Sequence, residues 1–117
     1  MRRALVVSQS VSMSDVAQRV FRGLGIGATH VANPSLLPAV VEAIGFEVIV
    51  FDMDLGEDDL ARCRRMQPKA FLILASNALL DPSEYAAQYV MLKPLNVVVL
   101  QRAMINLDLA GQQVSNS

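Results

Sequence analysis

The chain has 117 residues, a length that fits one domain with its own hydrophobic core and leaves no room for two. Its net charge is −1 and its basic residues form no long run, which argues against nucleic acid or an acidic membrane surface as a partner. The single cysteine, Cys63, excludes an intrachain disulfide and a metal site built from cysteines. No apolar run approaches the roughly 18 residues that span a membrane, so we expect a cytoplasmic protein.

Short apolar runs that suit buried strands alternate with segments whose apolar residues recur at helical spacing. The predicted strands cover residues 4–7, 28–32, 47–51, 70–75 and 89–92. Ser12 or Ser14 is expected to cap the first helix, whose buried face is predicted to comprise Val16, Ala17, Val20, Phe21 and Leu24.

Proline and asparagine residues mark the starts of later helices. Asn33-Pro34 predicts a helix that ends at Gly45, and Asp81-Pro82 predicts a brief one that ends at Ala87. A short helix is predicted over 58–66, and Asn96 is expected to cap a last helix that ends near residue 110. This alternation predicts a parallel five-stranded sheet with helices on both faces, a (βα)5 domain over 1–111 and a disordered tail over 112–117.

In an open parallel sheet, the functional site lies outside the carboxyl ends of the strands. Asp52 follows the third predicted strand and Asp54 comes soon after it, while Lys93 follows the fifth strand. A carboxylate that faces a lysine across this edge is typical of an aspartyl-phosphate site, where the carboxylate attacks phosphorus and the lysine holds the phosphoryl oxygens. The same two side chains are equally compatible with a buried ion pair that serves only stability.

These residues resemble the receiver (CheY-like) domains of two-component response regulators over nearly the whole chain. The resemblance rests on Leu5-Val6-Val7, on the strand that ends at Asp52, on 72–76, and on Lys93-Pro94 with the helix after it. It implies a flavodoxin-like three-layer sandwich with strand order 2-1-3-4-5. It also implies that Asp52 is the phosphoacceptor, that Lys93 contacts the phosphoryl group, and that the Lys93-Pro94 bond is cis.

Several positions depart from the receiver pattern. Ser8 and Gln9 stand where receivers carry a pair of acids that help to bind Mg²⁺. The position of the receiver hydroxyl falls on Ala75, so Ser76, its neighbour, is the candidate for contacting a phosphoryl group. Any Mg²⁺ would depend on Asp52 and Asp54, so we expect weak metal binding.

We therefore expect an atypical receiver in phosphorelay signalling that acts as a protein-interaction module, with weak or no Mg²⁺-dependent phosphorylation at Asp52. A conventional phospho-aspartate switch is the alternative. Phe51-Asp52-Met53-Asp54 also matches the motif of haloacid-dehalogenase-type phosphatases, but there the motif ends the first strand of a larger domain, so an enzyme is a distant third.

The last predicted helix carries two apolar stripes. One stripe has the helical spacing expected of residues that face the core. The other comprises Val98, Ile105 and Leu109 on the far side of the helix. A contiguous exposed apolar patch marks an interface. We expect a homodimer through this helix, or the docking of a signalling protein or histidine kinase on it.

Overall fold

The computed structural model describes residues 2–39 and 45–115, and side-chain surroundings are described up to residue 107. Five parallel strands form one sheet in the order β2-β1-β3-β4-β5, which confirms the predicted fold and strand order. The strands are β1 (Arg3–Val7), β2 (Gly27–Val31), β3 (Val48–Asp52), β4 (Phe71–Ser76) and β5 (Tyr89–Leu92).

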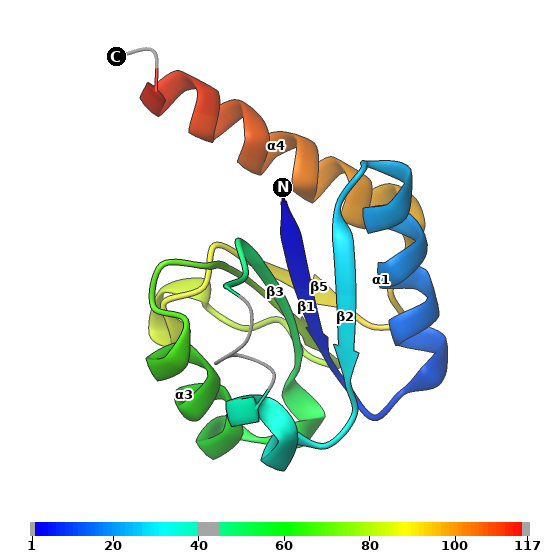
Figure 1. Cartoon of the computed structure of the whole chain (residues 1–117), viewed down its shortest axis with the longest axis vertical. Helices are drawn as coiled ribbons and strands as arrows, with labels where there is room; N and C mark the ends of the chain where they lie inside the picture. Colours follow the sequence, from blue (N-terminus) through cyan, green and yellow to red (C-terminus); the bar gives the residue numbers. More distant parts are fainter. Residues whose placement is uncertain (1, 40–44, 116–117) are drawn as a thin grey trace.

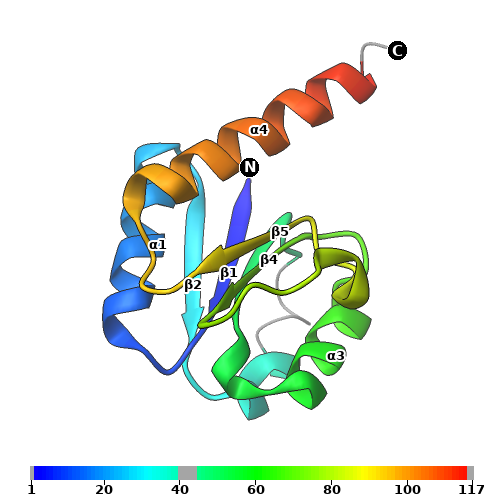
Figure 2. The same cartoon turned by 180° about the vertical axis from the view of Figure 1, so that it is seen from behind.

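Helices cover both faces of this sheet, as Figures 1 and 2 show. The α-helices are α1 (Val11–Gly23), α3 (Glu57–Met66) and α4 (Val97–Ser115), and the 3-10 helices are η1 (Pro34–Leu36), η2 (Met53–Leu55) and η3 (Pro82–Tyr85). α1 and α4 lie on one face and α3 lies on the other (Figure 1). The domain is therefore a three-layer sandwich.

Alternation along the strands divides the core into two halves. Val50 and Ile73 belong to the apolar cluster that α1 and α4 cover, whereas Phe51 and Leu74 belong to the cluster on the α3 side. Val48–Asp52 is buried along its whole length, as expected for the central strand of a parallel sheet covered on both faces. Asp52 thus ends a strand that packing holds rigidly on both sides.

The start of α1 differs from the prediction. Ser10, and not Ser12 or Ser14, caps the helix: its backbone is extended and its side chain accepts a hydrogen bond from the Met13 N–H over 3.2 Å. An N-cap needs this extended backbone just before the first helical turn. Because the helix begins earlier, Met13 and Ser14 join its buried face, while Leu24 is exposed.

Two later helices also differ in extent. Between β4 and β5 the predicted helix to Ala87 is a short 3-10 helix, because Ala86 adopts a left-handed conformation and ends it. The last helix does not end near residue 110 but continues through Gly111 to Ser115, so part of the expected tail is helical. One glycine costs a helix only about 1 kcal/mol and no proline follows it.

The second predicted helix is described only in part. Its expected cap is confirmed, since the Asn33 side chain accepts a hydrogen bond from the Ser35 N–H at the start of η1. Residues 40–44 of this predicted helix lie outside the described residues. No helix among the described residues is both long and apolar enough to cross a lipid bilayer.

Candidate functional site

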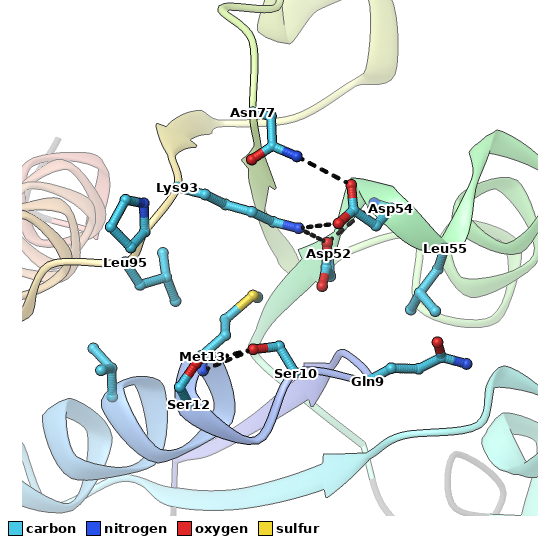
Figure 3. A pocket seen from close by; sticks show the side chains of 12 residues that line it. Gln9, Ser10, Ser12, Met13, Asp52, Asp54, Leu55, Asn77, Lys93 and Leu95 are labelled. Carbon is cyan, nitrogen blue, oxygen red and sulfur yellow. Dashed lines mark hydrogen bonds and ion pairs between the residues drawn. The ribbon is translucent and has the colours of Figure 1, made fainter.

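Asp52 and Lys93 meet at the carboxyl edge of the sheet, as the strand pattern predicts. The register pairs Asp52 with Ala75 on β4, and Ala75 with Met91 on β5, so the residues that follow these strands converge. Lys93 comes directly after β5, and its peptide bond to Pro94 is cis, as the resemblance implied. Figure 3 shows the Lys93 side chain extending across the edge to Asp52 and Asp54.

Three donors hold the Asp52 carboxylate. Oδ1 forms an ion pair with the Lys93 ammonium and accepts a hydrogen bond from the Asp54 N–H over 3.0 Å. Oδ2 accepts the hydroxyl hydrogen of Ser8 over 2.8 Å. The side chain of Asp52 is only 4% exposed, so these contacts take the place of water around the charge.

Lys93 is shared between two carboxylates. Its ammonium lies 2.8 Å from Asp54 Oδ2 as well as against Asp52, and its side chain is 15% exposed. Asp54 faces solvent and also accepts a hydrogen bond from the Asn77 amide over 3.4 Å. The lysine charge is thus already engaged by two residues of its own chain.

The ionisation of the pair follows from these contacts. Burial raises the pKa of the Asp52 carboxyl, but the hydrogen bonds from Lys93, from the Asp54 N–H and from Ser8 together outweigh burial and hold the pKa below its ordinary value. Burial lowers the pKa of the Lys93 ammonium, and the bonds to Asp52 and Asp54 more than compensate, so that pKa is raised. Both groups are charged at neutral pH.

Hydrogen bonds to its hydroxyl group and its carbonyl oxygen hold Ser8 in place, and the sequence did not predict them. Its oxygen accepts a hydrogen bond from the Ser10 N–H over 2.9 Å while its hydroxyl donates to Asp52. The His30 Nε2 donates to the Ser8 carbonyl oxygen over 2.7 Å. His30, a lone histidine on the edge strand β2, therefore anchors the loop that presents Ser8 to Asp52.

Gln9 and Ser76 are not part of this cluster. Gln9 is exposed, and Figure 3 shows its side chain extending away from Asp52. Ala75 pairs with Asp52 in the sheet register, so these two side chains share one face of the sheet. Ser76 is the next residue of β4, so its side chain projects from the opposite face. There its hydroxyl oxygen accepts a hydrogen bond from the Ala78 N–H over 3.1 Å.

A cavity of about 540 Å³ opens beside Asp52 and Lys93. Asp52, Asp54, Asn77 and Lys93 supply polar groups to its wall. Its apolar lining comes from Met13, Val16, Leu55, Pro94 and Leu95. The cavity has room for a small anionic group next to the lysine.

The two carboxylates at this edge are already engaged by groups of the same chain. Asp52 already accepts three hydrogen bonds, and Asp54 is bonded to Lys93 and Asn77. Ser8, which stands where the receiver resemblance places an acid, supplies a neutral hydroxyl group that donates its hydrogen to Asp52. Within the described part of the chain, no group of three or more His, Cys, Asp and Glu residues is arranged to hold a metal ion.

Other chemically distinctive residues serve packing. Cys63 is buried, and burial raises the pKa of its thiol to about 11 although nearby Arg64 lowers it, so the thiol is protonated at neutral pH. Arg64 donates to the carbonyl oxygens of Gln67, Ala70 and Ala86, which ties α3 to the two segments that flank β4. Arg64 therefore has a structural role.

The sequence matches no protein-family model and no curated protein sequence. Solved structures do resemble it. The receiver domain of TorR, a response regulator of the TMAO respiratory system, is 21% identical with a TM-score of 0.77, over 92% of this chain and 96% of that one. The Vibrio cholerae chemotaxis protein CheY4 is 15% identical with a TM-score of 0.77, over 91% and 98%.

A CheY-like response regulator receiver domain protein from Methanospirillum hungatei JF-1 is 18% identical with a TM-score of 0.77, and the match covers 97% of this chain and 98% of that one. These similarities span almost the whole of each chain at low sequence identity. They agree with the strand order of the sheet. The chain therefore has the fold of the receiver domains of two-component response regulators.

Proposed function

We propose that this chain is an atypical receiver that acts as a protein-interaction module in phosphorelay signalling, with weak or no Mg²⁺-dependent phosphorylation at Asp52. The observation that carries the proposal is the state of the Asp52 carboxylate. Lys93 and the Asp54 N–H engage one oxygen, and Ser8 engages the other. The position of the phosphoacceptor is retained, but its oxygens are held by the protein itself.

Charge supports the same proposal. A phosphoryl group carries about −1.5 to −2 at neutral pH. Asp52 and Asp54 contribute two negative charges and Lys93 one positive charge, so a phosphodonor meets a site that is negative before it arrives. Apart from Lys93, no positively charged residue of the described chain lines the cavity to offset that repulsion.

The parts that would transmit phosphorylation are also missing. Ala75, at the position of the receiver hydroxyl, is buried and has no group that could follow a phosphoryl oxygen. The receiver resemblance also implies an aromatic side chain on the fifth strand at Val90, and Val90 packs against the apolar cluster on the α3 side. A receiver without these parts is suited to constitutive recognition of a partner.

Helix α4 supplies a surface for such recognition. Leu100, Ala103 and Met104 are buried, whereas Val98 and Ile105 on the outer face are each about half exposed. Leu109, the third member of the predicted stripe, lies beyond the residues whose side-chain surroundings are described. We assign this outer stripe to a signalling protein or histidine kinase. A homodimer through the same stripe is the alternative, and the proposal keeps the cytoplasmic location.

One observation favours the conventional phospho-aspartate switch as a second candidate. Asp52 is ionised at neutral pH and borders a cavity of about 540 Å³. A carboxylate oxygen would form a bond to phosphorus while the leaving group of the phosphodonor departs with its electron pair. Lys93 would then have to leave Asp54 and contact the transferred group.

Intact-mass spectrometry separates the two candidates. The protein is incubated with a small phosphodonor and Mg²⁺, with Asp52→Asn as the matched control. We expect little or no mass gain in the wild type and none in Asp52→Asn. Conversion of most of the wild type to a species with one added phosphoryl group, absent from Asp52→Asn, establishes the conventional switch. Turnover of a generic phosphate ester that is lost in Asp54→Ala would instead support a phosphatase.

A further inference from the structure

Each oxygen of the Asp54 carboxylate faces a donor at the carboxyl edge of the sheet (Figure 3). Oδ2 lies 2.8 Å from the Lys93 ammonium, and Oδ1 accepts a hydrogen bond from the Asn77 amide over 3.4 Å. The two donors come from the ends of different strands, Lys93 after β5 and Asn77 after β4. The side chain of Asp54 is thus held in the way that a small bound oxyanion would be held.

The local backbone brings Asp54 to these donors. Asp54 is the middle residue of the 3-10 helix η2, and the Asp52 side chain caps that helix by accepting a hydrogen bond from the Asp54 N–H over 3.0 Å. Gly56 ends η2 at a φ of 100°, a conformation that glycine adopts without strain, and the chain then enters α3. Both ends of η2 are therefore fixed, and its acidic side chain stays within reach of the lysine.

The two ion pairs of Lys93 differ in exposure. The side chain of Asp52 is 4% exposed and that of Asp54 is 65% exposed. Water competes for an exposed carboxylate, so an ion pair with Asp54 breaks far more easily than the enclosed pair with Asp52. An ammonium group has three N–H donors. When Asp54 leaves, the lysine keeps Asp52 and one of its donors is released.

The charge of the cavity depends on the same residue. Among the described residues that line it, Asp52 and Asp54 contribute two negative charges and Lys93 one positive charge, a sum of −1. Without the Asp54 carboxylate the sum is zero, and the donors of Lys93 and Asn77 become available. The volume of about 540 Å³ is sufficient for a small oxyanion.

We propose that Asp54 is an autoinhibitory group, whose carboxylate occupies an oxyanion subsite formed by Lys93 and Asn77 and keeps free oxyanions out of the cavity. This inference rests on the proposed function and deepens it, because it names the group that withholds Lys93 from a phosphoryl group. An oxyanion has to displace Asp54, so its apparent affinity is reduced by the fraction of molecules in which Asp54 has left the lysine.

Titration with inorganic phosphate, without metal ions and at constant ionic strength, tests the proposal. Backbone amide chemical shifts near Lys93 and Asn77 are followed by NMR in the wild type, Asp54→Ala and Asp58→Ala. Asp58→Ala is the matched control, because it removes an exposed carboxylate from α3, outside the lining of the cavity. We expect saturable binding to Asp54→Ala that is at least about tenfold tighter than to the wild type, and no change in Asp58→Ala.

Further variants locate the binding. Adding Lys93→Met to Asp54→Ala should abolish it, and adding Asn77→Ala should weaken it. Asp54→Asn removes the charge without changing the shape and repeats the test in case Asp54→Ala fails to fold; it should also bind phosphate more tightly than the wild type.

Two results overturn the proposal. One is equal binding, or no binding, in the wild type and the Asp54 variants. The other is binding to Asp54→Ala that neither added substitution changes. Inorganic phosphate is not a phosphodonor, so these outcomes do not depend on whether Asp52 accepts a phosphoryl group. This proposal and the proposed function therefore fail separately.

Discussion

The ammonium group of Lys93 forms an ion pair with the carboxylate of Asp52, and both side chains are largely enclosed by protein. The two residues lie far apart in the chain, but each follows the end of a parallel strand. Enclosed charges contribute to stability only as long as each has its partner, since water no longer solvates them fully. The pair should therefore affect the stability of the fold as well as the chemistry of the site.

Removal of the lysine charge should destabilise the fold. In Lys93→Met, Asp52 keeps the hydrogen bonds from Ser8 and the Asp54 N–H but loses its counter-charge, and we expect a loss of about 3 kcal/mol in the free energy of unfolding. Asp52→Asn should cost less, because Lys93 retains Asp54. Urea denaturation measures both. Equal losses of a few tenths of a kcal/mol would mean that the ion pair contributes nothing.

Ser8 should contribute through its hydroxyl. Ser8→Ala removes the hydrogen bond to Asp52 Oδ2, and a hydrogen bond to a charged group is worth about 1.5–3 kcal/mol. Ser12→Ala is the control, because Ser12 is exposed in the same region and its hydroxyl meets only that of Ser10. Urea denaturation should show a loss for Ser8→Ala and little change for Ser12→Ala. The same loss in both variants would show that Ser8 acts only through the loop backbone.

The Asp52 site should be visible in the dependence of stability on pH. Because the pKa of folded Asp52 is lowered, its contribution is complete above its unfolded value of about 3.9 and is lost as the pH falls through the folded pKa. The difference in unfolding free energy between wild type and Asp52→Asn should therefore be constant near neutrality and shrink below about pH 4. A difference that grows as the pH falls would contradict the lowered pKa.

The Cys63 thiol should be inert in the folded protein. It is buried and its pKa is raised to about 11, so the reactive thiolate is scarce at neutral pH. We expect a thiol reagent to label Cys63 fully in denaturant and very slowly in buffer, at a rate set by unfolding. Rapid labelling of the native protein would show that the α3 side of the core opens readily.

Much of the site was predictable because parallel strands bring their carboxyl ends to one edge. That rule predicts from the sequence alone that Asp52 and Lys93 lie together, as they do. The rule does not determine the pairing register, which decides the face of the sheet from which each side chain projects. Ser76 was therefore expected beside Asp52, but it projects from the other face. The hydrogen bonds of Ser8 and His30 depend on a loop conformation that spacing alone does not specify.

Helix boundaries show the same limit. Asn96 was predicted as the cap of the last helix, and its side chain accepts hydrogen bonds from the N–H groups of Val98 and Val99. The predicted end of that helix was wrong, because a single glycine is a weak stop signal when no proline follows. The cap of α1 was misplaced because several serines stand close together, and only the backbone conformation selects Ser10.

The most direct test of the account compares the wild type with the double variant Ser8→Asp/Gln9→Asp by intact-mass spectrometry, in the presence of a phosphodonor and Mg²⁺. These substitutions remove the Ser8 hydroxyl from Asp52 and put acids at the two positions where the receiver resemblance expects them. We predict little or no mass gain in the wild type and a gain of one phosphoryl group in the double variant, abolished by a further Asp52→Asn substitution. Phosphorylation of the wild type at Asp52 to the same extent as the double variant would contradict the account.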